Sequence, residues 1–162
     1  MVEENRKREL FLADDSQIIR IKVGRALRDA GYTVNEFTNG DDIIAKIREL
    51  GKDKDVVVIT DNQMPNSDGT KRQNNGIEVL NAASLKAEEL KHTNPEVIIK
   101  TIMISASLPS EQSKEVVAAG TKADAHFDKT DKDYIPDLVN KVGKLLQYTP
   151  TPLQQTSTGR VV

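Results

Sequence analysis

Short apolar runs alternate along this chain with segments in which apolar residues recur every three or four positions. The most apolar run, residues 56–59, has four β-branched residues in a row. It is too short for a buried helix and is typical of a parallel strand that is covered on both faces. Four other segments predict strands, at residues 10–13, 32–38, 97–105 and 123–128.

A segment with helical spacing follows each predicted strand. Ser16 and Asn39 open the first two helices, and Gly31 and Gly51 follow their last apolar positions as stop signals. The predicted helices cover residues 16–31, 39–51, 77–92, 110–120 and 134–146. Five strands alternating with five helices predict an α/β fold, in which helices cover both faces of a parallel sheet.

The length of 162 residues suits one domain with a substantial core. Residues 1–7 form a charged arm, and we expect the domain to occupy residues 8–147. Residues 148–162 are rich in Thr, Pro, Gln and Ser and have no apolar period. We therefore expect them to be a disordered tail or a linker.

Composition excludes several classes of function. The net charge is −2, and Lys and Arg are scattered, which argues against nucleic-acid binding through bulk charge. The absence of cysteine excludes disulfides, thiolate zinc sites and cysteine nucleophiles, and two histidines argue against a histidine-based metal site. No apolar run is long enough for a membrane span or a secretory signal. We therefore expect a cytoplasmic protein that does not bind membranes.

Chemically active side chains stand at the ends of the predicted strands. In chain order they are Asp14, Asp15, Asp61, Ser105 and Lys129. Each also has a simpler interpretation, since the acids can cap a turn or a helix, the serine can bond to backbone, and the lysine can be a solvated surface group. Because the carboxyl ends of parallel strands meet at one edge of a sheet, their joint placement favours a site.

Three carboxylates at one edge repel each other, so at least one would hold a proton without compensation. A hard divalent cation removes this conflict. Mg²⁺ fits best, because it binds one or two carboxylates, a carbonyl and waters, and leaves positions for phosphate oxygens. The formal charges of three aspartates, Mg²⁺ and Lys129 cancel.

Four motifs in this order resemble the response-regulator receiver domain of two-component signalling, of the stand-alone chemotaxis type. They are Phe11-Leu12-Ala13-Asp14-Asp15-Ser16, Ile59-Thr60-Asp61-Asn62-Gln63-Met64-Pro65, Met103-Ile104-Ser105-Ala106 and Phe127-Asp128-Lys129. The resemblance covers about residues 8–147. It implies a flavodoxin-like, doubly wound, five-stranded parallel sheet of strand order 2-1-3-4-5 with five helices.

The resemblance also implies a phosphoacceptor and a metal site. Asp61 would attack the phosphorus of a phosphohistidine on a sensor histidine kinase or a histidine phosphotransfer protein. Asp15 and Asp61 would bind Mg²⁺ directly, Asp14 would bind it through water, and the backbone carbonyl of Gln63 would complete the protein ligands. We expect a signalling protein rather than an enzyme.

Further roles follow from the same resemblance. Lys129 and Ser105 would contact the phosphoryl oxygens, and their inward movement would act as the switch. His126 stands three positions before Lys129, where the family usually has an inward-swinging Tyr or Phe. It is either a switch residue with pH sensitivity or an ordinary half-exposed strand histidine. A downstream protein would bind the surface formed by residues 110–146.

Two other features depart from the family pattern. Thr130 follows Lys129, where the family commonly has a proline, often after a cis bond, so this loop is either trans and rebuilt or strained. Residues 66–76 form a polar loop with about seven more residues than the family usually has there. It is either a solvated loop or a segment that gates phosphodonor access or contacts the kinase.

Two other functions stay open at this point. A Mg²⁺ phosphohydrolase that forms an aspartyl phosphate needs a second acid two residues after its nucleophile, and Gln63 stands there. A receiver that is never phosphorylated would act only as a binding module. A phosphorylated receiver would bind a partner or pass the phosphoryl group onward, and the chain can also be one module of a longer protein.

Overall fold

The structure is a computed structural model that describes residues 6–65, 68–72, 75–105 and 123–152. The main sheet consists of β1 (Lys7–Ala13), β2 (Thr33–Phe37), β3 (Lys54–Asp61), β6 (Ile99–Ser105) and β7 (Ala125–Asp128). The helices in this part of the chain are α1 (Gln17–Asp29), α2 (Gly40–Arg48), α3 (Asn75–Lys91) and α5 (Tyr134–Leu146). The strand order is β2-β1-β3-β6-β7 and every pair is parallel, which confirms the expected 2-1-3-4-5 order.

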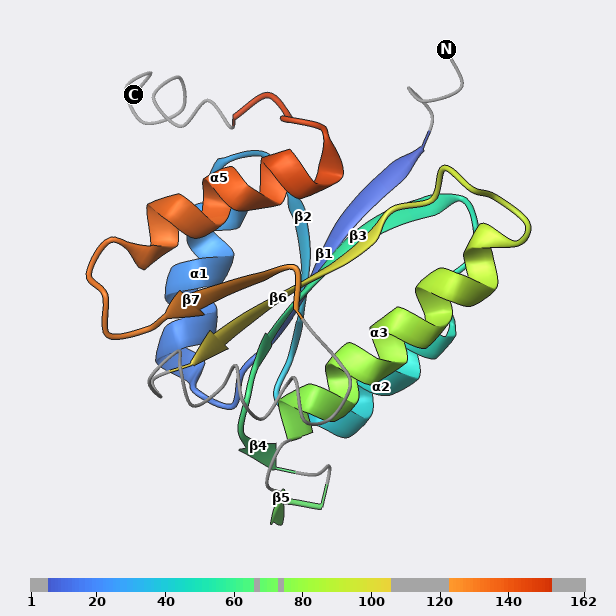
Figure 1. The fold of residues 1–162 in the computed structure, drawn as a ribbon. Coiled ribbons are helices and arrows are strands. Elements are labelled where there is room, and N and C mark those ends of the chain that lie inside the picture. The colour runs from blue at the N-terminus through green and yellow to red at the C-terminus, as the bar shows by residue number, and fades with distance from the viewer. Residues whose placement is uncertain (1–5, 66–67, 73–74, 106–122, 153–162) are drawn as a thin grey trace, which may run out of the picture.

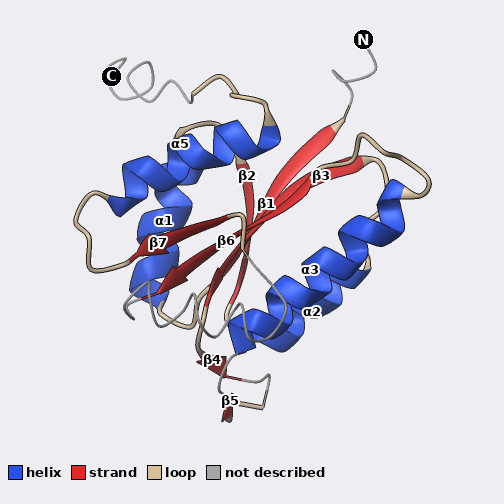
Figure 2. Ribbon diagram, viewed as in Figure 1, coloured by secondary structure: helices blue, strands red, loops and turns tan. Residues whose placement is uncertain are grey.

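The sheet is the middle of three layers. Helices α1 and α5 cover one face, and α2 and α3 cover the other (Figures 1 and 2). Because successive strand residues point to opposite faces, Leu10 and Leu12 pack towards α1 and α5, whereas Phe11 packs towards α2 and α3. The central strand β3 is buried on both faces, as its β-branched run predicts.

The helices begin and end close to their predicted positions. Ser16 and Asn39 are the N-cap residues of α1 and α2, and each side chain accepts a hydrogen bond from a backbone N–H three residues later. Gly31 has a φ of 102°, a left-handed conformation that suits glycine after a helix. The helix expected at residues 110–120 lies outside the described residues.

The polar loop expected at residues 66–76 contains a small hairpin instead of being irregular throughout. Strand β4 (Met64–Pro65) pairs antiparallel with β5 (Lys71–Arg72). At the turn, Gly69 has a φ of 92°, and Asp68 Oδ1 accepts hydrogen bonds from the N–H and the hydroxyl of Thr70. Two-residue strands are too short for an alternating apolar pattern, so the sequence gives no signal for them.

The fold extends slightly beyond residues 8–147. Arg6 forms an ion pair with the buried Asp55 of β3, at the end of the sheet where its strands begin. After α5, the ring of Tyr148 lies 3.9 Å from the guanidinium of Arg8, and Pro150 is buried. Within the described part of the chain, no helix is long and apolar enough to cross a membrane.

Candidate functional site

Three aspartates meet at the carboxyl edge of the sheet. Strands β1 and β3 are paired in register, with Ala13 opposite Thr60, so the residues that follow them lie side by side. Carboxylate oxygens of Asp14, Asp15 and Asp61 lie within 4.8 Å of one another. Asp14 is fully buried, while Asp15 is exposed to solvent at the rim. The structure therefore brings together the three acids that sequence analysis selected.

Lys129 provides the positive charge of this cluster. Its Nζ lies 2.6 Å from Asp14 Oδ2 and 3.3 Å from Asp61 Oδ1, and its backbone N–H donates to the carbonyl of Ser105. Burial by itself lowers the pKa of Lys129, but the charges of Asp61 and Asp14 outweigh it, so the pKa is raised. The ammonium therefore stays charged among the carboxylates.

The surroundings of Asp61 disfavour the ionised form of its carboxyl group. Burial and the neighbouring charge of Asp14 raise its pKa to about 6, against the opposing effects of Lys129 and of the Asn62 N–H, which donates to Oδ1 at 2.8 Å. One ammonium therefore does not fully offset the acids. Three convergent carboxylates with excess negative charge are a donor set that fits a hard divalent cation such as Mg²⁺.

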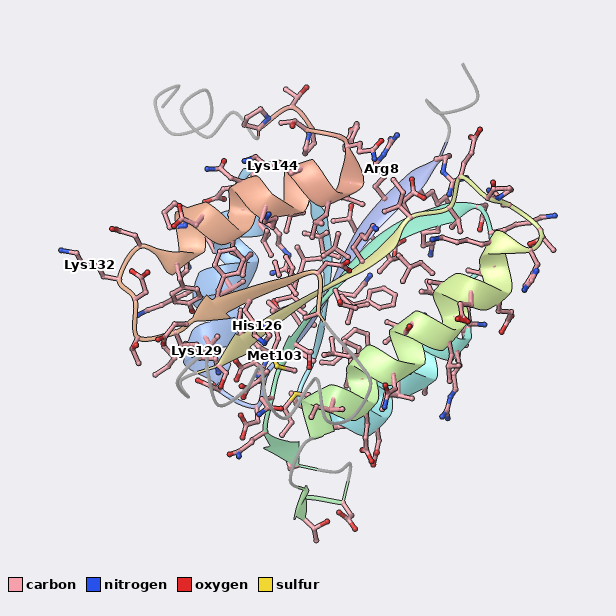
Figure 3. All side chains as sticks on the ribbon, viewed as in Figure 1. Arg8, Met103, His126, Lys129, Lys132 and Lys144 are labelled. Atoms are coloured by element: carbon pink, nitrogen blue, oxygen red, sulfur yellow. The ribbon has the colours of Figure 1, made fainter. Side chains whose placement is uncertain are left out.

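The other predicted site residues lie around this cluster. Ser105 is the last residue of β6, is 4% exposed and pairs in register with Asp128. The side chain of Gln63 is exposed in the turn after β3. His126 is half-buried on β7 opposite Met103 (Figure 3), and burial lowers its pKa. Its buried Nε2 has no hydrogen-bond partner among the described residues. The roles of Ser105, Gln63 and His126 stay predictions.

Comparison with known proteins identifies the family. A family model described as the response regulator receiver domain matches residues 10–130. The chain therefore belongs to the response regulator receiver domain family. Members of this family are signalling modules of two-component systems rather than classical enzymes.

Individual relatives agree with this assignment. The chain is 29% identical over 139 residues to the sensor kinase CckA of Brucella abortus (strain 2308), an alignment that covers 85% of this chain but only 12% of the kinase. Among solved structures, the fold matches chemotaxis response regulator CheY4 of Vibrio cholerae with a TM-score of 0.60 at 23% identity, covering 85% of this chain and 98% of the other. Response regulator TrrA of Thermotoga maritima matches with a TM-score of 0.54 at 25% identity, covering 84% and 98%.

The loop that holds Lys129 in this receiver domain is trans and rebuilt, one of the two predicted outcomes. The Lys129–Thr130 peptide bond is trans. Asp128 Oδ1 accepts hydrogen bonds from the Thr130 N–H at 2.8 Å and from its hydroxyl at 2.6 Å, and these bonds lower the pKa of Asp128. Because proline has no N–H, this arrangement requires a non-proline residue at position 130.

Gly76, beside the end of β3, is a residue that sequence analysis did not select. Its N–H donates to the carbonyl of Asn62 at 2.8 Å. A Cβ atom at this position would lie 2.5 Å from the carbonyl oxygen of Asp61 and 2.7 Å from Asn62 Cα, so only glycine allows α3 to begin this close. The signal available in the sequence is the Asn75-Gly76 pair directly before the apolar helix pattern.

Arg20 on α1 is a second residue that sequence analysis did not select. Its Nη1 donates to the backbone carbonyl of Asp14 at 2.7 Å. In the sequence Arg20 is one of several basic residues on an amphipathic helix, so neither its residue type nor its position indicates this contact.

Proposed function

We propose that this receiver domain accepts a phosphoryl group on Asp61 in a Mg²⁺-dependent reaction. The observation that supports the proposal most directly is the meeting of three aspartates and Lys129 at the carboxyl edge of a parallel sheet. An oxygen of Asp61 attacks the phosphorus of a phosphohistidine, and the O–P bond forms as the P–N bond breaks. The electron pair of the broken bond stays on the imidazole nitrogen, which becomes protonated.

In this proposal each side chain has a separate role. Asp15, Asp61 and the Gln63 carbonyl would hold Mg²⁺, with Asp14 bound to it through water. The ion would supply positive charge against the transferring group. Lys129 and Ser105 then stabilise the phosphoryl oxygens, since transfer changes the acceptor charge from −1 to about −2. The structure of TrrA is described as a complex with Mg²⁺ and a beryllium fluoride, which supports a magnesium site in this family fold.

We propose that the phosphodonor is a sensor histidine kinase or a histidine phosphotransfer protein. Helix α1 starts directly after the acids and exposes Ile18 by 65% and Ile21 by 48%. Two exposed isoleucines beside the site offer apolar contact area to a docking protein. The similarity to CckA, a sensor kinase, supports a place in a phosphorelay.

Output in this proposal uses the surface of residues 110–146, of which residues 123–146 are described. His126 belongs to this surface, on β7 three residues before Lys129, and we propose that it changes position when Asp61 is phosphorylated. The β4–β5 hairpin follows β3 directly at the rim, which supports a role in donor contact. A deletion of residues 70–75 tests that role, because unchanged phosphotransfer and dephosphorylation rates would refute it.

The central test is the intact mass of the protein after incubation with acetyl phosphate and Mg²⁺. We expect a gain of about one phosphoryl group in the wild type. The gain should be absent in Asp61→Asn and absent in the wild type when EDTA replaces Mg²⁺. Asp68→Asn is the matched control, since Asp68 is an exposed acid in the loop that follows the same strand.

The same experiment separates the alternatives. Release of inorganic phosphate without a stable adduct, lost in Asp61→Asn, would favour a phosphohydrolase. No adduct and no release, with acetyl phosphate and with a phosphohistidine donor, would favour a module that only binds partners. An adduct that persists in Asp61→Asn would assign the acceptor to another residue.

A further inference from the structure

A chain of charged contacts joins the outer strand β2 to the acids of the site. Arg20 Nη1 donates to the Asp14 carbonyl at 2.7 Å, and Arg20 Nε lies 3.6 Å from Glu36 Oε1. The second oxygen of Glu36 accepts a hydrogen bond from Arg28 Nη1 at 2.8 Å. The carboxylate of Glu36 therefore lies between two guanidinium groups of α1.

Gly24 provides the space for this arrangement. It lies between the two arginines on α1 and is buried. A Cβ atom on Gly24 would lie 2.9 Å from Glu36 Oε2 and 3.1 Å from Arg28 Nη1. Glycine in a helix interior destabilises the helix relative to alanine. The close approach of the Glu36 carboxylate to the helix accounts for its presence here.

Arg20 acts on the peptide unit that joins Asp14 to Asp15. Two other bonds already hold Asp14, because its N–H donates to the Phe37 carbonyl at 3.1 Å and its Oδ1 accepts from the Ser16 N–H at 2.9 Å. Neither of these bonds involves the carbonyl group. The contact from Arg20 therefore fixes the plane of the following peptide, from which the exposed Asp15 projects.

We propose that Arg20 is a positioning residue for the divalent-cation site, oriented by Glu36 in the space that Gly24 provides. This inference rests on the proposed function, because it assumes that Asp15 binds Mg²⁺. Partners that orient metal ligands without touching the metal commonly change metal affinity by about 10–100-fold. Arg20 would therefore strengthen Mg²⁺ binding although it is itself a cation.

The sign of the effect distinguishes positioning from simple electrostatics. A positive charge near a cation site repels the cation, so loss of the Arg20 charge alone would tighten Mg²⁺ binding. Loss of positioning would weaken it. Gly24→Ala separates the two effects further, because it changes no charge and displaces the Glu36 carboxylate, which contacts both Arg28 and Arg20.

The test is the Mg²⁺ dissociation constant of the full chain, measured by isothermal titration calorimetry. We expect Arg20→Met to weaken binding about tenfold, and Glu36→Gln and Gly24→Ala to weaken it in the same direction. Arg25→Met is the matched control, since Arg25 is an exposed arginine on the same helix. It should bind within about twofold of the wild type, because exposed charges are largely screened.

The outcomes separate this inference from the proposed function. If the wild type binds Mg²⁺ and Arg20→Met binds it equally or more tightly, positioning by Arg20 is refuted and the phosphoacceptor proposal stands. If the wild type binds no Mg²⁺, both proposals fail. Should Arg20→Met fail to fold by circular dichroism, Glu36→Gln and Gly24→Ala decide the question together, and wild-type affinity in both variants refutes the inference.

Discussion

The charge of Asp61 gives a prediction that needs no phosphodonor. Burial and the charge of Asp14 raise the pKa of Asp61 from an ordinary 3.8 to about 6 in the folded chain. The folded protein therefore binds a proton at Asp61 more tightly than the unfolded chain does. Between these two pKa values, stability falls as the pH rises, and the loss is complete above the folded pKa. Asp61→Asn has no ionisable group at this position and should not lose this stability.

The size of the effect follows from the two pKa values. Their difference corresponds to about 3 kcal/mol of unfolding free energy at pH 8. This value already includes the attraction between Asp61 and Lys129, whose atoms lie 3.3 Å apart, because that attraction lowers the pKa of Asp61. For a chain of this size, about 3 kcal/mol raises the melting temperature by roughly 6–12 °C.

The assay is thermal unfolding by circular dichroism at pH 4, 6 and 8 in EDTA. We expect Asp61→Asn to be the more stable protein at pH 8 and the advantage to shrink towards pH 4. Mg²⁺ should stabilise the wild type more than the variant, because binding to the folded state adds stability. Glu88→Gln, at an exposed acid on α3, is the control. An advantage that is absent at pH 8, or that grows as the pH falls, would refute the reasoning.

Four further predictions concern single positions. Arg6→Ala should cost about 3–5 kcal/mol in urea unfolding, because it leaves the buried Asp55 carboxylate without its cation; a loss below about 1 kcal/mol would place the pair among weak surface pairs. Gly76→Ala should destabilise the fold by about 1–3 kcal/mol and reduce phosphoryl uptake measured by mass, through the clash with the Asp61 carbonyl. Asn39→Ala should cost about 1 kcal/mol of thermal stability, because it removes the N-cap of α2. Burial lowers the pKa of His126, so protonation opposes folding, and the wild type should lose stability below about pH 6.5. His126→Phe should lack this loss, and identical wild-type and variant profiles would contradict the prediction.

The sequence predicts the strands and the site acids because both depend on local pattern. A run such as residues 56–59 can be buried on both faces only in a central strand, and the residue that ends it must lie at the carboxyl edge. The acids that follow β1 and β3 therefore meet whatever the details of packing. The prediction of the strand order had another basis. It came from the family resemblance and not from the pattern of the residues.

The contacts that could not be predicted join residues on different elements, so the helical and strand periodicities of the sequence do not indicate them. Arg20 and Glu36 lie on different elements, and their contact depends on how α1 packs against β2. Gly76 is needed because α3 begins beside the backbone of Asp61, and the polar loop before it carries no pattern that indicates this approach. Such contacts depend on tertiary packing, which a single sequence does not reveal.

The hydrogen bonds of Thr130 have a consequence for protein engineering. Proline is common at this position in the family. Thr130→Pro would nevertheless remove the N–H and the hydroxyl that donate hydrogen bonds to Asp128. Without these hydrogen bonds, the Asp128 carboxylate would no longer hold the backbone that follows Lys129. Proline at position 130 is therefore expected to loosen the backbone at Lys129, unless position 128 is redesigned with it.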